Sequence, residues 1–273
     1  MKYLLHNIQK WIVLALMVSS IQSCTDVSNE MDRAEVSFTA TLPADICTRS
    51  FGDAGQVNTL IIGILNDRQQ EIDRQAFSVN GTTVNIRVSL VQSQVYNFVF
   101  WAYDSSQKTY DLTDLTAIRM NELPTSMSFP QSEAMDAFYS VIENITVAGS
   151  TNYSVELVRP LAQINVGTTG EPILTSFTAK AVPDTFYPFS NTVGGTTEYT
   201  WNFKTTTTET FTANGKAYNY LSMGYVFAPG TTTKIATELT LIEGEKSITI
   251  EFPQVEIEAN KRSNIVGEFT RRN

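Results

Sequence analysis

Glu35-Val-Ser-Phe-Thr-Ala-Thr-Leu42 decides the fold class, because apolar and polar residues alternate along its whole length. Every second position from Val36 to Leu42 is apolar, which is the period of a β-strand with one buried face. Thr83–Leu90 (TVNIRVSL) repeats this alternation. Both segments predict strands that turn one face towards a core.

Similar segments, rich in Thr, Val, Ile, Tyr and Phe, recur through the rest of the chain. The further predicted strands are Thr59–Leu65, Tyr96–Tyr103, Asn152–Arg159, Leu161–Gly167, Tyr199–Phe203, Tyr218–Val226, Lys234–Ile242, Lys246–Phe252, Val255–Glu258 and Ser263–Phe269. Turn signals separate them, and Asn80-Gly81 before Thr83 predicts a hairpin. No amphipathic helix longer than about two turns is expected. Short strands at this spacing predict an all-β chain of two β-sandwiches, with Pro160 as the seam.

The N-terminus is typical of an exported bacterial lipoprotein. Lys2 and Lys10 give a positively charged start, and the apolar segment Trp11–Val18 that follows is too short to span a bilayer. Ser23-Cys24 then resembles a lipobox, in which the cysteine is acylated after cleavage before it. We therefore expect a signal peptide over residues 1–23, a lipidated Cys24 and a flexible tether over residues 24–34. The alternative is an ordinary signal peptide that contains a cysteine.

Composition excludes several functional classes. The 19 Lys and Arg residues are outnumbered by 28 Asp and Glu, giving a net charge of −9, whereas nucleic-acid binding needs a basic face. The one histidine, His6, lies in the signal peptide, so the mature chain has no imidazole for a catalytic triad or a zinc site. Cys47 has no histidine to activate it, and no phosphate loop, paired metal-binding cysteines or calcium loop is present. We expect no enzyme activity, no cofactor and no metal.

Aromatic residues in the second half offer one candidate binding surface. Tyr199, Trp201 and Phe203 alternate along a single predicted strand and so share a face. An exposed row of rings could stack on sugars, but the favoured interpretation is that the rings fill the sandwich core.

A second candidate is the segment Thr48-Arg-Ser-Phe-Gly52, between two predicted strands. Arg49 in such a loop is a site for a trypsin-like protease. Cleavage between Arg49 and Ser50 would release residues 35–49 as a leader strand and leave an unpaired groove. Another chain could fill that groove by adding a strand. The alternative is an ordinary solvated arginine.

With these segments in order, the chain resembles the fimbrillin-like lipoproteins of Bacteroidales, which build type V pili. The resemblance runs from about Ala34 to Phe269. Its motifs are Thr48–Gly52 with the strand Val57–Leu65, Phe98-Val-Phe-Trp-Ala-Tyr103, Asp136-Ala-Phe-Tyr139 with Val158–Gly167, and Asn260–Gly267.

The resemblance implies two transthyretin-like β-sandwich domains in tandem, over residues 35–159 and 160–273, without catalysis. It also implies cleavage after Arg49 at the outer membrane and complementation by a strand from another fimbrial subunit. Polymerising members carry a donor extension beyond the closing strand. The four residues that follow Phe269 here are too few to form one. An anchor, accessory or tip subunit is therefore expected rather than a stalk subunit.

These observations predict a fimbrium-associated surface lipoprotein that takes part in pilus assembly and adhesion. Its partners would be other fimbrial subunits, the outer membrane through the lipid, and a ligand on a host or bacterial surface. The alternative is a non-fimbrial surface lipoprotein that binds glycan or another ligand through the aromatic C-terminal half.

Overall fold

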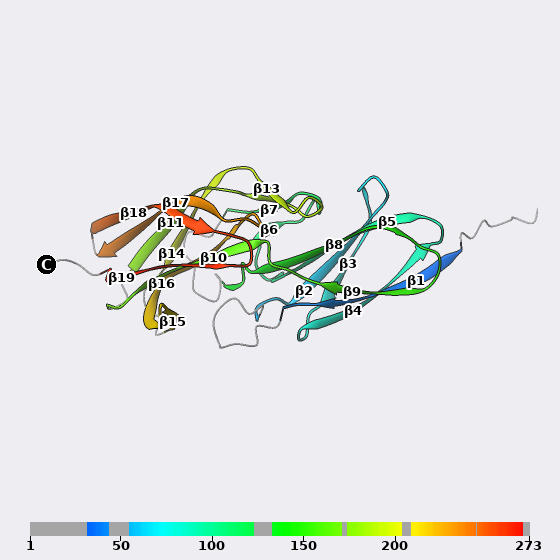
Figure 1. Ribbon diagram of the computed structural model, residues 1–273, viewed down its shortest axis with the longest axis horizontal. Helices are drawn as coiled ribbons and strands as arrows, with labels where there is room; N and C mark the ends of the chain where they lie inside the picture. The colour runs from blue at the N-terminus through cyan, green and yellow to red at the C-terminus, as the bar shows by residue number, and fades with distance from the viewer. Residues whose placement is uncertain are drawn as a thin grey trace, which may run out of the picture. The chain divides into compact units, whose positions relative to one another are not determined.

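The computed structural model describes residues 32–43, 55–122, 133–170, 174–203, 209–243 and 245–269. These segments fold as β-strands and their connections (Figure 1). Cys24, Cys47, Arg49 and Ser50 lie outside the described residues, so their predicted roles stay predictions.

The first half of the chain is a sandwich of two sheets. Sheet A has the order β4-β1-β9 and sheet B the order β3-β2-β5-β8. The strands are β1 (Arg33–Thr41), β2 (Thr59–Leu65), β3 (Glu71–Ser78), β4 (Thr83–Val91), β5 (Val95–Tyr103), β8 (Ala137–Thr146) and β9 (Thr151–Glu156). Apolar residues from both sheets, with Phe38, Phe98 and Phe100 at the centre, form one buried cluster.

The second half repeats this arrangement. Sheet E has the order β15-β16-β10-β19 and sheet D the order β14-β11-β17-β18. The strands are β10 (Leu161–Thr168), β11 (Leu174–Val182), β14 (Thr197–Phe203), β15 (Thr210–Ala213), β16 (Lys216–Phe227), β17 (Thr233–Glu243), β18 (Lys246–Ile257) and β19 (Arg262–Gly267).

The two halves share one topology. The row β4-β1-β9 corresponds to β16-β10-β19, and the row β3-β2-β5-β8 corresponds to β14-β11-β17-β18. In each half the first strand is antiparallel to one neighbour and parallel to the other. β1 and β10 are therefore equivalent strands.

Short strands inserted into each half meet in a fifth sheet. Sheet C, in the order β13-β12-β7-β6, combines β6 (Tyr110–Asp111) and β7 (Ile118–Met120) with β12 (Thr185–Tyr187) and β13 (Thr192–Gly194). The second buried cluster likewise draws residues from both sides of Pro160, including Trp101 from β5 and Phe227 from β16. The expected boundary at Pro160 thus separates two sandwiches that share part of their core.

The predicted strands are found with small shifts in their ends, and two details are corrected. Asn80-Gly81 does form a turn, with Gly81 at a φ of 101°, but it is not a hairpin. β3 pairs with β2 and β4 with β1, so this turn carries the chain from sheet B to sheet A. Lys246–Phe252 and Val255–Glu258 are parts of one strand, β18, with a register shift opposite Pro253.

Candidate functional site

β1 is the inner strand of sheet A, which makes it the centre of the candidate site (Figure 1). It pairs antiparallel with β4 along its whole length, from Arg33 opposite Val91 to Thr41 opposite Thr83. On its other side it pairs parallel with β9, which places Phe38 beside Tyr153. β4 and β9 are held in one sheet through β1, so removing β1 would leave a groove with an unpaired strand edge on either side.

The buried face of β1 contacts the core of the first sandwich. Phe38 is only 1% exposed. Its ring centroid lies 4.8 Å from that of Phe98 and 5.3 Å from that of Phe100, both on β5. Tyr153 of β9 stacks on the same ring with centroids 5.6 Å apart. Phe38 is therefore the one aromatic side chain through which the buried face of β1 contacts this core.

The outer face of β1 makes polar contacts with β4. The Arg33 guanidinium donates hydrogen bonds to Oγ and the carbonyl oxygen of Ser89, at 3.1 and 2.5 Å. Glu35 lies 3.8 Å from Arg87 in an exposed ion pair. Exposed pairs of this kind add little stability, so burial of the inner face holds β1 in place.

β10 occupies the equivalent place in the second half, but its environment differs. All residues of β10 are buried, whereas β1 alternates between buried and more exposed positions. β10 also follows directly from Arg159 and Pro160, and Arg159 is fixed in a buried ion pair. β1 can therefore leave its sheet at a lower cost than β10.

Tyr199 and Trp201 are part of the core, as the favoured interpretation expected, and the alternative of an exposed sugar-stacking surface is wrong for these two residues. Trp201 is fully buried and Tyr199 is 4% exposed. The Tyr199 hydroxyl donates to the carbonyl oxygen of Met120 at 3.0 Å, and Nε1 of Trp201 lies 3.4 Å from Sδ of Met135. Neither ring presents a face to solvent. The side chain of Phe203 lies outside the described part of the structure.

Two acidic side chains close in sequence, Glu133 and Asp136, are buried at the junction of the halves. Asp136 accepts hydrogen bonds from Nε and Nη2 of Arg159, at 2.6 and 2.8 Å. Burial raises the pKa of Asp136, and the adjacent Arg159 opposes that shift. Glu133 accepts a hydrogen bond of 3.1 Å from the Tyr225 hydroxyl. Because protein groups occupy both carboxylates, this cluster supports a structural role.

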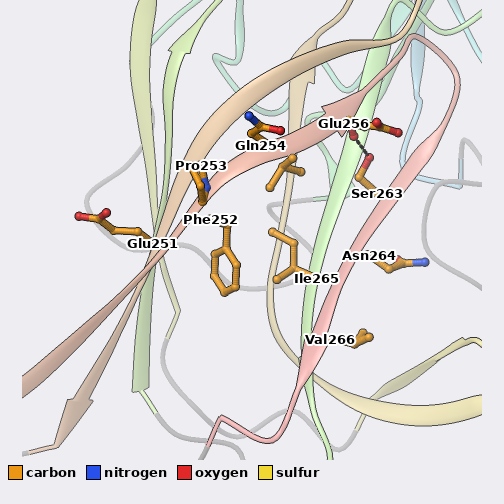
Figure 2. Close-up of a pocket in the computed structure, with 10 residues that line it drawn as sticks. Glu251, Phe252, Pro253, Gln254, Glu256, Ser263, Asn264, Ile265 and Val266 are labelled. Atoms are coloured by element: carbon orange, nitrogen blue, oxygen red, sulfur yellow. Dashed lines mark hydrogen bonds between the residues drawn. The ribbon is translucent and has the colours of Figure 1, made fainter.

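A shallow groove of about 740 Å³ runs between β18 and β19, the edge strands of sheets D and E (Figure 2). Phe252 and Ile265 are half-buried in it, and the Ser263 hydroxyl donates to the carbonyl oxygen of Glu256 across it. Pro253 lies in the bulged part of β18 and has no N–H to offer an added strand. The edge at β18 is therefore protected against addition of a strand, whereas the groove that removal of β1 would leave has no such proline.

Within the described ranges, no group of three or more His, Cys, Asp and Glu residues is arranged to hold a metal ion. The same part of the chain contains no helix with the length and apolar character needed to cross a membrane.

Sequence reasoning predicted β1 but missed the residues that line the groove, and cleavage after Arg49 stays a prediction. Tyr153 and Ile86 flank Phe38 on the neighbouring strands. Their role depends on which strands pair with β1, and strand order is set by contacts between distant segments. The alternation along Thr83–Leu90 indicated that Ile86 is buried. It did not indicate which residue of another strand lies beside it.

The sequence was compared with family models and with proteins of curated function. A family model described as "Family of unknown function (DUF6562)" matches residues 28–272. No protein of curated function matches the sequence.

Solved structures share the fold at low sequence identity. A proposed adhesin from Bacteroides thetaiotaomicron is 14% identical with a TM-score of 0.53, over 81% of this chain and 80% of that one. A proposed adhesin from Bacteroides ovatus is 11% identical with a TM-score of 0.51, over 92% of each chain. A fimbrial assembly protein from Parabacteroides distasonis is 12% identical with a TM-score of 0.49, over 88% of this chain and 92% of that one. The first two confirm the predicted all-β fold.

Proposed function

The chain belongs to the DUF6562 family, and we propose that it is a non-catalytic, fimbrium-associated surface lipoprotein that acts in pilus assembly and adhesion. The observation that carries this proposal is the position of β1 between β4 and β9. A strand that is central in its sheet, close to the N-terminus and followed by Arg49 is suited to removal by a protease. A strand from another subunit would then restore sheet A.

Three further points support the proposal. The fold is shared with two proposed adhesins of Bacteroides. The buried carboxylates of Asp136 and Glu133, which could have formed a catalytic pair, are hydrogen-bonded to Arg159 and Tyr225. The candidate sugar-stacking rings Tyr199 and Trp201 are buried, so the glycan-binding alternative loses the surface on which it depended.

Lipidation at Cys24 would hold the protein at the outer membrane, because two acyl chains give stable anchoring where one does not. Replacing Cys24 with Ala should release the protein from the membrane fraction. Cys47→Ala is the matched control and should stay membrane-bound. Retention of Cys24→Ala in the membrane would contradict the lipobox.

Intact-mass analysis of the protein from its native cell envelope tests the processing step. A strand acceptor should be a lipid-free chain that begins at Ser50, whereas an anchor should be diacylated and begin at Cys24. Arg49→Ala should abolish the shorter species, while Arg68→Ala, at an exposed turn, should not. A fragment of unchanged size in Arg49→Ala would count against cleavage at this residue.

A further inference from the structure

The side chains through which β1 contacts the core differ in size. A strand that replaces β1 would have to match these sizes in the same order. Along the buried face the residues are Ala34, Val36, Phe38, Ala40 and Leu42, each 6% exposed or less. The central residue is aromatic, and the next buried residue towards the C-terminus is an alanine. The pattern is therefore uneven, unlike a uniform apolar stripe.

The central position is a pocket for a ring. Its sides are Ile86 on β4 and Tyr153 on β9, which lie opposite Phe38 in register. Its floor is formed by Phe98 and Phe100, with ring centroids 4.8 and 5.3 Å from that of Phe38. A smaller side chain would leave a cavity lined by aromatic groups, and such cavities are costly because their walls relax only partly.

The position of Ala40 has the opposite property. Ala40 is fully buried and lies between Val84 on β4 and Val155 on β9. Both valines are themselves buried, so a larger side chain at this position would have to displace core groups rather than turn to solvent. A ring there would overpack the sandwich.

These two positions together fix the register of any strand in the groove. A shift by two residues keeps the same face inward and is therefore the competing arrangement. In this chain such a shift would place a ring on the site of Ala40 or Val36 and a small residue in the ring pocket. Either outcome combines a cavity with overpacking.

We propose that the groove between β4 and β9 selects a partner strand that runs parallel to β9 and carries an aromatic residue followed, two positions later, by alanine or glycine. This inference rests on the proposed function, because it assumes that β1 is exchanged for a strand of another subunit. It adds the chemistry by which the partner would be recognised.

The test uses the full mature chain with residues 48–52 replaced by a recognition sequence for a site-specific protease. After cleavage, fluorescein-labelled peptides with the sequence of residues 32–43 are added in a denaturant concentration that speeds strand release. Incorporation is measured by fluorescence polarisation, and peptide affinity by competition. The peptides are the natural sequence, Phe38→Ala, the double exchange Phe38→Ala/Ala40→Phe, and Ser37→Ala as an outward-facing control.

We expect the natural and Ser37→Ala peptides to bind within about threefold of each other. Phe38→Ala should bind about 100-fold more weakly, because loss of a buried ring raises the dissociation constant by about this factor or more. The double exchange has the same composition as the natural peptide and should not bind measurably.

The outcomes separate the two proposals. Equal binding of all four peptides would overturn the selection rule while leaving strand exchange intact. Failure of the natural peptide to enter the cleaved chain would overturn strand exchange itself, and the selection rule with it.

Discussion

A Cβ placed on Gly224 would lie 2.3 Å from Cε2 of Trp201, well inside van der Waals contact. Gly224 is on β16 of sheet E, and Trp201 is the fully buried indole of sheet D. The absence of a side chain at residue 224 thus lets the indole approach the backbone of β16 closely. Close packing of this kind leaves no room for an added methyl group.

Replacing Gly224 with Ala should lower the free energy of unfolding by about 1–3 kcal/mol, because the indole must move within a filled core. Gly230→Ala is the matched control, since a Cβ there meets no atom within 4 Å. Denaturant unfolding followed by tryptophan fluorescence measures both variants. Equal stability of the two would show that the core around Trp201 is loosely packed.

The buried pair of Asp136 and Arg159 is a second feature on this scale. The guanidinium of Arg159 also lies 4.9 Å from the ring of Phe138 and donates to Oδ1 of Asn260 at 3.2 Å. Arg159→Met alone should cost about 3–5 kcal/mol, because it leaves a buried carboxylate without its partner. The double variant Asp136→Leu/Arg159→Met should recover much of that loss. A double variant no more stable than Arg159→Met would mean that the charges themselves are needed.

On the scale of elements, β1 and β10 are equivalent in topology but differ in burial. Amide hydrogens open by local and sub-global unfolding, and strands with fewer buried contacts open first. In hydrogen exchange of the full chain, amides of β1 should therefore exchange at least about tenfold faster than those of β10. β4 is the internal control, because it should lose protection together with β1. Slower exchange in β1 than in β10 would contradict the idea that β1 is the releasable strand.

Element type was readable from the sequence for many strands with a buried face but not for all of them, because β8, β11 and β15 contain buried residues and were not predicted. β2 was predicted with its observed ends, and β1 and β4 within two residues, because alternation or a continuous apolar run marks them. β3 was missed because its sequence, EIDRQAFS, has few buried residues and no clear period. The inserted strands β6, β7, β12 and β13 are short and owe their pairing to distant partners, which local patterns do not contain.

Sites were harder to predict than strands. Alternation along the predicted strand placed Tyr199 and Trp201 on the same face. It does not say whether that face meets solvent or a second sheet. The groove under β1 was expected from the chain order of β1 and Arg49. Its aromatic pocket was not, because Tyr153, Phe98 and Phe38 meet only through the pairing of strands far apart in sequence.

On the scale of the whole molecule, the two sandwiches are joined by more than the covalent link at Pro160. Sheet C takes strands from both halves, and β7 pairs directly with β12. Trp101 of β5 packs near Phe186 and Phe227 of the second half, with ring centroids 6.2 and 6.5 Å away. Loss of packing in either half therefore exposes apolar surface of the other, which favours a single cooperative unfolding transition.

Buried tyrosines make that transition sensitive to alkaline pH. Burial is the largest cause that raises the pKa of Tyr110, Tyr199, Tyr220 and Tyr225 above the usual value near 10. In the unfolded chain these phenols ionise near pH 10, whereas the folded protein keeps them protonated. Above that pH the unfolded state binds fewer protons, so the free energy of unfolding falls as the pH rises.

The stabilisation from these groups should be complete below about pH 10 and lost progressively as the pH rises through their raised pKa values. Each fully buried phenol contributes a slope of about 1.4 kcal/mol per pH unit in that range. Denaturant unfolding across the alkaline range, followed by tyrosinate absorbance, measures the effect. Tyr225→Phe should make the decline shallower, since it removes one titrating group from the unfolded chain. Ionisation of these four tyrosines near pH 10 in a chain that stays folded would show that solvent reaches the shared core.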